Sequence, residues 1–217
     1  MNIYSKYIFP WILDKFMGLG SFQEKRKEVL ASAEEKVLEI GLGTGLNLAE
    51  YPAHIKTITS VDVNIGMNSY IKKRAKSAGK TIDHQVITAE KLPMADQTFD
   101  TVVSTWTLCS IPNVHQALEE INRVLKHNGK FIFIEHGLGK KKSTQIWQKR
   151  LGPFWKKVGD GCHLDRNIKD LISSHAFKIT EYKEFDMRNM PKLTSHMYQG
   201  IALKKTKSII PKEKIQN

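Results

Sequence analysis

The 217-residue sequence contains only two cysteines, Cys109 and Cys162, and no long hydrophobic run. Two cysteines suggest no disulfide framework and are too few for a metal site made of cysteines alone. The apolar patch Ile8–Leu13 is far shorter than the roughly 20 residues of a membrane-spanning helix. The N-terminus also lacks the basic start and cleavage site of a signal peptide. These absences favour a globular protein of the cytoplasm.

Acidic residues are scarce in the last third of the chain, and this leaves the protein basic. The net charge is +12, and residues 140–217 hold 18 of the 34 Lys and Arg residues but 7 of the 22 acidic ones. Such a patch could meet nucleic acid, an anionic membrane or an acidic substrate, or it could be a solvated face. The length predicts one main domain at 36–204, preceded by a helical cap at 1–35 and followed by a basic tail at 205–217.

Short apolar segments alternate with amphipathic ones through most of the chain. The expected strands are 36–40, 57–62, 82–88, 100–104, 130–135, 178–185 and 196–204. The expected helices are 46–51, 66–78, 114–126, 144–157 and 168–174, with helices broken near Pro10 and Gly18 inside 4–30. The pattern predicts an α/β fold with a mostly parallel sheet covered on both faces. The last two strands would form an antiparallel pair at the sheet edge.

A glycine-rich turn follows the first expected strand. Gly41, Gly43 and Gly45 remove the Cβ atoms that would keep a ligand away from the turn, and the following helix offers free N–H groups. Glu39, just before the turn, could meet an amine-bearing ligand. The pattern alone also fits a nicotinamide dinucleotide site or a structural turn, but Gly-x-Gly-x-Gly lacks the spacing of a pyrophosphate cradle.

The next strand ends carry further polar side chains. Asp62 lies about twenty residues past the glycines, where a carboxylate can accept both hydroxyls of a ribose, and Val63 follows it. Glu90, after the third strand, could recognise an adenine edge, although a solvated glutamate would look the same. Ligands of open sheets bind beyond the C-terminal strand ends, so these segments predict one crevice.

Residues 36–136 resemble the core of a class I S-adenosylmethionine-dependent methyltransferase of the ubiquinone and menaquinone biosynthesis branch. The matching segments are 38–45, 61–62, 89–93, 99–100 and 125–131. The resemblance implies a Rossmann-like seven-stranded fold with S-adenosylmethionine as cofactor. It implies that the three glycines approach the methionine part of the cofactor and that Asp62 holds the ribose. Ala89 and Glu90 would flank the adenine, and Thr105 would follow the sulfonium end.

A closer resemblance covers most of the chain. Segments 107–113, 135–136, 159–166 and 195–203, together with Trp155, are similar to the methyltransferase-like 7 group. Its animal members are membrane-associated thiol S-methyltransferases. Their N-terminal anchor is not matched, and the short segment Tyr4–Phe16 stands in its place. The resemblance implies a small, rather apolar acceptor such as a thiol, a quinone precursor or a lipid head group.

Methyl transfer from a sulfonium needs positioning and desolvation, and for some acceptors a general base. His136, at the end of the fifth expected strand, is the first candidate for that base, although a capping role fits as well. His163, Asp160 and His115 follow it. His163 beside Cys162 gives two possible metal ligands, which do not make a site, so we expect no metal. We expect the cysteines to be packing residues.

Two other functions compete with this one. A phospholipid N-methyltransferase at a membrane surface would use the apolar patch and the lysines. Methylation of nucleic acid or protein would use the basic last third, but no RNA-binding module is recognisable. The segment Ser104–Thr107 also lacks the motif that nucleobase amine methyltransferases commonly carry. The sequence therefore predicts a small-molecule acceptor, with anionic membrane as a possible peripheral partner and nucleic acid disfavoured.

Overall fold

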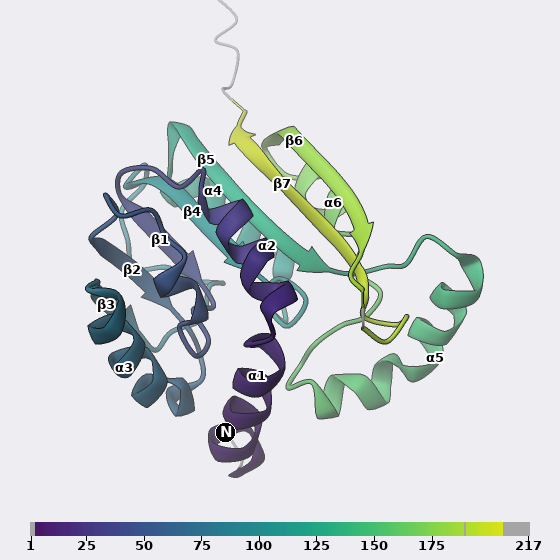
Figure 1. Ribbon diagram of the computed structural model, residues 1–217. Coiled ribbons are helices and arrows are strands. Elements are labelled where there is room, and N and C mark those ends of the chain that lie inside the picture. Colours follow the sequence, from purple (N-terminus) through teal and green to yellow (C-terminus); the bar gives the residue numbers. More distant parts are fainter. Residues whose placement is uncertain (1–2, 189, 206–217) are drawn as a thin grey trace, which may run out of the picture.

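The computed structural model describes residues 3–188 and 190–205 and contains a single seven-stranded sheet within them (Figure 1). The strands are β1 (Val37–Ile40), β2 (Thr57–Val61), β3 (Thr81–Gln85), β4 (Phe99–Thr105), β5 (Leu125–His136), β6 (Phe177–Asp186) and β7 (His196–Lys204). Their order is β3-β2-β1-β4-β5-β7-β6, and β1 to β5 pair in parallel. Strand β7 is antiparallel to both β5 and β6, which confirms the predicted sheet and its antiparallel edge pair.

Helices cover both faces of the sheet because its strands alternate apolar side chains between two cores. Phe131 and Phe133 of β5 pack in the core under α4 (Val114–Val124) and α6 (Ile168–Ser173). Ile132 and Ile134 pack in the core under α2 (Gly20–Leu30) and α3 (Asn68–Ala78). Figure 1 shows α2 in front of the sheet and α4 and α6 behind it.

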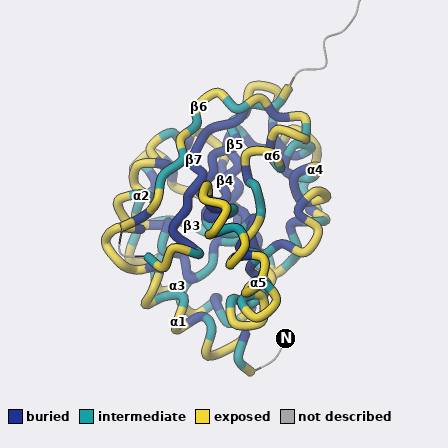
Figure 2. Tube along the Cα trace, turned by 90° about the vertical axis from the view of Figure 1, so that its right-hand side faces the viewer, coloured by how far each residue is buried: buried dark blue, intermediate teal, exposed yellow. Residues whose placement is uncertain are grey.

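The remaining helices lie around the C-terminal ends of the parallel strands. They are the π-helical turn η1 (Tyr4–Ile8), α1 (Phe9–Met17), the 3₁₀ turns η2 (Leu46–Ala49) and η3 (Ile65–Met67), and α5 (Lys142–Val158). Both α1 and α5 lie toward the end of the molecule that carries the N-terminus, while central strands are buried (Figure 2). In the described residues, no helix is long and apolar enough to cross a membrane.

Three local predictions differ from the structure. The helix predicted at 114–126 ends at Val124, and β5 begins at once with the buried Leu125, running through the His-Asn-Gly segment with an irregular register. The predicted helix 46–51 is only the single turn η2. The break predicted near Pro10 is a change of helix type: the π-helical turn η1 ends at Ile8, and α1 begins at Phe9 with Pro10 in its first turn, where proline is tolerated.

The N-terminal helices end at Leu30 and β1 begins at Val37, and the predicted division of the chain at residue 36 stays a prediction. The basic tail predicted at 205–217 lies outside the described residues except for Lys205.

Candidate active site

The glycine turn after β1 borders a cavity of about 490 Å³, a volume typical of small-molecule sites. Gly41 and Gly43 line it, each with positive φ (70° and 57°). A Cβ at Gly41 would overlap the Thr107 side chain, so this glycine permits the close approach of the loop after β4. A Cβ at Gly43 would meet nothing within 4 Å, so this glycine leaves open space beside the cavity. Gly45 lies outside the cavity wall, at the start of η2.

Asp62, directly after β2, lines the same cavity and also holds the glycine turn. Its carboxylate accepts hydrogen bonds from the N–H groups of Gly43 (2.9 Å) and Asn64 (2.8 Å). Burial raises the pKa of Asp62, while these two hydrogen bonds act in the opposite direction. Val63 follows it on the cavity wall. The predicted ribose position is therefore at the cavity, although its occupancy stays a prediction.

Glu39 is fully buried and does not line the cavity. Its carboxylate accepts hydrogen bonds from Asn47 Nδ2 (2.6 Å) and from the hydroxyl of Tyr51 (2.8 Å). Burial raises the pKa of Glu39 to about 7, against the effect of these hydrogen bonds and of the Arg26 charge. The structure thus gives Glu39 a supporting place behind the turn rather than one on the cavity wall.

Asn47 and Arg26, which the sequence reasoning did not single out, do line the cavity at this point. Asn47 Nδ2 also donates to the hydroxyl of Thr105 (2.9 Å), and Asn47 Oδ1 is buried with no partner among the described residues. Arg26 is buried, donates to the carbonyl of Met17 (2.7 Å), and lies over the Trp106 ring. Burial lowers the pKa of Arg26 to about 10, so the guanidinium stays charged. An unpaired acceptor and a buried cation suit a zwitterionic amino-acid group.

The loop after β3 forms the other end of the cavity. Ala89 lines it together with Ile87, Thr88, Ile111 and Pro112, so the slot is mainly apolar, as a flat heterocycle requires. The Glu90 side chain faces away from it and accepts from the Thr88 hydroxyl (2.9 Å) and the Asn113 N–H (2.5 Å). Glu90 therefore fixes the loop before α4. Its predicted contact with adenine stays a prediction that the geometry does not favour.

The N-terminal helices close the cavity from one side. Tyr4, Phe9, Ile12, Leu13, Phe16 and Met17 line it. The Tyr4 hydroxyl donates to the carbonyl of Val158 (2.6 Å), and the Ser5 hydroxyl to Asp160 (2.7 Å). The Asn64 side chain, after β2, donates to the Ser5 carbonyl (2.7 Å). The segment thus joins the loop after β2 to the end of α5, as a cap over the site would.

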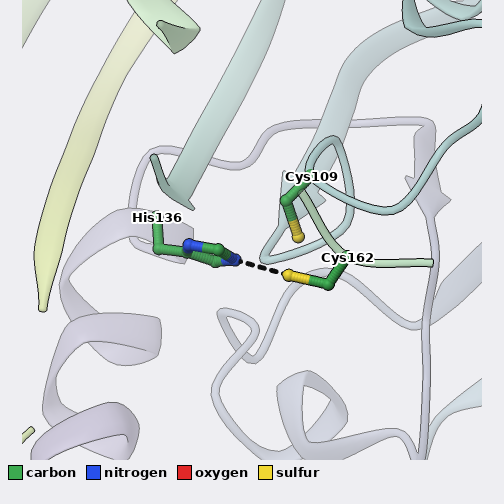
Figure 3. Close-up of side chains that lie close together, drawn as sticks. All are labelled: Cys109, His136 and Cys162. Atoms are coloured by element: carbon green, nitrogen blue, oxygen red, sulfur yellow. Dashed lines mark hydrogen bonds between the residues drawn. The ribbon is translucent and has the colours of Figure 1, made fainter. Parts of the chain in front are cut away.

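A cluster of sulfur and imidazole also lines the cavity, and Figure 3 shows its three side chains. Cys109 follows β4, His136 ends β5, and Cys162 follows α5. The thiol and imidazole ligand atoms of these three buried residues lie within 4.8 Å of one another. His136 Nε2 is 3.0 Å from Cys162 Sγ, and Trp155 Nε1 donates to the same sulfur at 3.3 Å.

The cluster is electrostatically coupled. A hydrogen bond from Cys109 lowers the pKa of Cys162 to about 4; burial opposes this, and the charge and hydrogen bond of His136 add to it. Burial by itself lowers the pKa of His136, but the Cys162 charge and hydrogen bond raise it more. The hydrogen bond with Cys162 and burial raise the pKa of Cys109. A protonated His136 cannot accept a proton, so its predicted role as a general base stays a prediction that requires a neutral ring.

The other three candidate bases lie in different places relative to the cavity. Asp160 lines the cavity, whereas His163 does not, and His115 stacks on His175 with ring centroids 5.2 Å apart. The expectation of no metal rested on the pair His163 and Cys162. The fold instead brings together Cys109, His136 and Cys162, a set that no sequence spacing could reveal because the three residues come from separate segments. The available signal in the sequence was that Cys109 follows the strand β4 and that His136 ends the neighbouring strand β5.

Comparisons with known proteins agree with this geometry. A family model described as a methyltransferase domain matches residues 38–133. The thiol S-methyltransferase TMT1B of Rattus norvegicus is 32% identical over 183 residues, covering 76% of this chain and 74% of that protein. The phosphatidylethanolamine N-methyltransferase of Cereibacter sphaeroides is 26% identical over 148 residues, covering 67% and 71%. A putative methyltransferase structure from Bacillus halodurans superposes with a TM-score of 0.68 at 15% identity, covering 86% of this chain and 100% of that one.

Proposed function

Because the chain belongs to the class I S-adenosylmethionine-dependent methyltransferases, in the family of the TMT1 thiol S-methyltransferases, we propose that it methylates the sulfur of small apolar thiols. S-adenosylmethionine supplies a methyl group on a sulfonium sulfur, which a nucleophile takes by in-line displacement. The methyl donor follows from the family, whereas the acceptor is the proposal. The observation that carries it is a cavity lined both by apolar N-terminal side chains and by the cysteine and histidine cluster.

The cofactor half of the cavity fits S-adenosylmethionine. Open space beside Gly43 gives room for a ligand against the turn, and Asp62 offers a carboxylate to a ribose. Arg26 and Asn47 present a cation and an unpaired acceptor to the charged amino-acid end. The apolar slot around Ala89 accommodates the base. These assignments rest on the geometry of the side chains.

On this proposal the acceptor half positions its substrate chiefly through apolar contact. Side chains from α1, together with Trp106 and Met197, form its wall. An apolar thiol loses little hydration there, and a desolvated thiolate is a stronger nucleophile. A highly charged thiol would lose its hydration without matching partners.

The decisive experiment measures S-adenosylhomocysteine formation by the purified full chain with a panel of acceptors. The panel contains alkanethiols of increasing length, glutathione, phenols and phosphatidylethanolamine. We expect turnover with the alkanethiols that rises with chain length, and little turnover with glutathione. Product from phenols or amines without product from any thiol would overturn the proposal.

Two neighbouring residues on α1 supply a matched pair of variants. Ile12 lines the cavity, whereas Trp11 is exposed and does not. Ile12→Ala removes three apolar carbons, worth about 2.4 kcal/mol together if fully buried. Because Ile12 is 42% exposed, we expect about half of this, a rise in the KM for an alkanethiol of roughly 5- to 10-fold. Trp11→Ala should leave that KM unchanged. An equal effect of both variants would show that the α1 wall does not contact the acceptor.

Asp62→Ala tests the cofactor site separately. We expect loss of S-adenosylmethionine binding by calorimetry, because the variant removes the carboxylate and releases the N–H of Gly43. Asp83→Ala, on the exposed side of β3, is the control and should bind normally. Full affinity in the Asp62 variant would overturn the proposed cofactor geometry.

A lipid head group is the second candidate acceptor, and exposed apolar side chains near the cavity favour it. Tyr7, Ile8 and Trp11 are exposed near α1, and Trp147 and Phe154 are exposed on α5. Lysines and arginines of α5 interleave with them, as on a surface that docks on anionic membrane. Phosphatidylethanolamine presented in vesicles, and methylated faster than alkanethiols, would favour this alternative.

A further inference from the structure

We propose that Cys109, His136 and Cys162 form a zinc site, and that its fourth position takes the sulfur of the methyl acceptor. The first part stands on the geometry of three side chains. The second part rests on the proposed thiol acceptor. The two parts are therefore tested by separate measurements.

The ligand set is one that zinc prefers. Two thiolate sulfurs and one imidazole nitrogen bind Zn²⁺ at about 2.3 Å and 2.0–2.1 Å, which places tetrahedral ligand atoms roughly 3.5–3.8 Å apart. The three ligand atoms already lie within 4.8 Å of one another, so only small rotations are needed. The residues lie on three segments, and their ligand atoms point toward one another (Figure 3).

The backbone that carries these ligands is held firmly. The carboxylate of Glu135 accepts from the N–H groups of Thr107 and Leu108 (3.0 and 3.1 Å), just before Cys109. The carbonyl of Cys109 accepts from the N–H of His163 (2.8 Å). Arg166 donates to the carbonyl of Leu108 and thereby ties the same turn to the segment that follows Cys162. A site held in this way needs little reorganisation to receive a metal.

The immediate surroundings of the sulfur and the ring also suit a metal ligand. Trp155 Nε1 donates to Cys162 Sγ, and such a bond stabilises a thiolate. His136 Nε2 lies 3.0 Å from the same sulfur, and a metal ion would displace the proton that the two atoms share. Both the Nε2 lone pair and the thiolate would then be available to the ion.

The fourth position faces the cavity. All three ligands line it, and no fourth cysteine, histidine or carboxylate joins the group in the described part of the chain. Three protein ligands with one open position are the pattern of catalytic rather than structural zinc. The apolar side chains of α1 line the same cavity, in which the acceptor is proposed to bind.

Coordination would activate an acceptor thiol without a protein base. The thiol R–SH loses its proton to solvent when its sulfur binds the ion, because a metal-bound thiol is deprotonated. A sulfur lone pair then forms the new S–CH₃ bond. The electron pair of the broken C–S bond stays on the sulfur of S-adenosylhomocysteine. The thioether product carries no negative charge, binds zinc more weakly than the thiolate, and can leave.

The first measurement is metal content and affinity in the reduced full-length protein. We expect close to one equivalent of zinc after dialysis, and Co²⁺ in its place should give the intense visible bands of tetrahedral coordination with thiolate-to-metal charge transfer. His136→Gln should lose the site, with affinity reduced at least 100-fold. His163→Gln is the matched control, because His163 lies outside the group, and it should bind normally.

Folding of the variants is followed by circular dichroism, and thermal unfolding supplies a second readout. Zinc should raise the Tm of the unaltered protein, with the stabilisation growing as the logarithm of the zinc concentration over its Kd, and should leave the Tm of His136→Gln unchanged. The absence of about one tightly bound equivalent in protein with two reduced thiols would overturn the site. Equal binding by both histidine variants would also overturn it.

The second measurement adds hexanethiol to the Co²⁺ protein. We expect the charge-transfer band to gain intensity as a third sulfur joins the metal, and methyl hexyl sulfide should cause no such change. Metal binding without a spectral response to thiol would overturn the acceptor's place on the metal but leave the site. Thiol methylation by metal-free protein at the full rate would overturn the activation step while supporting the proposed function.

Discussion

Gly43 offers a test of the cofactor cavity in which backbone strain can be subtracted. Its φ of 57° lies in the left-handed region, and an added Cβ would meet no atom within 4 Å. Gly79, which ends α3, has nearly the same φ of 62° and equally open space, but it lies outside the cavity wall. Alanine at either position should therefore lower the free energy of unfolding by a similar amount, about 1–2 kcal/mol.

The two variants should differ in cofactor affinity. The Cβ of Gly43→Ala would lie in space that the cofactor is proposed to fill, and overpacking of that kind costs about 1–3 kcal/mol. This corresponds to a loss of affinity for S-adenosylmethionine of roughly 5- to 150-fold. Gly79→Ala should bind with unchanged affinity, because its methyl group lies away from the cavity.

Calorimetric titration gives the two dissociation constants, and denaturant unfolding of the cofactor-free proteins gives the two stabilities. The expected pattern is equal destabilisation with affinity lost only in the Gly43 variant. Normal affinity of Gly43→Ala would refute the location of the cofactor against this turn. An equal loss in both variants would show that strain, rather than occupied space, weakens binding.

Three further predictions follow from buried or exposed groups. The pKa of Glu39 is about 7 in the folded protein against an ordinary value of 4.5, so the neutral side chain should stabilise the cofactor-free protein at low pH. As the pH rises from about 5 to 8, the protein should lose roughly 3 kcal/mol of this stability. In urea unfolding, Glu39→Gln should flatten this dependence of stability on pH. Gly41→Ala should destabilise the protein more than Gly43→Ala, by thermal unfolding, because its Cβ would overlap a side chain. The full chain should sediment with anionic vesicles, and a Trp11→Ala, Phe154→Ala double variant should sediment less; equal sedimentation with neutral vesicles would contradict a role for charge.

Most of the fold could be predicted because its signals are local. The apolar period of each strand and the glycines after β1 lie within a few residues of one another, and parallel strands bring their C-terminal ends together without further information. The predicted helix at 114–126 failed at its end for a nonlocal reason. Leu125 is buried against the sheet, and this packing outweighs the turn preference of the His-Asn-Gly segment.

The candidate site was predictable only in part. Asp62, Val63, Ala89 and Thr105 line the cavity as expected. Glu39 and Glu90 do not, because the direction of each side chain depends on which partners lie beside it: Asn47 and Tyr51 for the first, and the loop before α4 for the second. Arg26 and Asn47 were missed, since a charged or polar residue on a helix looks solvated until packing buries it.

The sequence by itself determined the methyl donor of this protein, and it did so through contiguous motifs at the ends of neighbouring parallel strands. The tertiary structure alone decided which cysteine and histidine side chains meet at the cavity. Cys109, His136 and Cys162 are far apart along the chain, and they meet only because β4, β5 and the loop after α5 converge on one wall of the cavity. A local pattern is readable in one dimension, whereas a site assembled from distant segments exists only after the chain has folded.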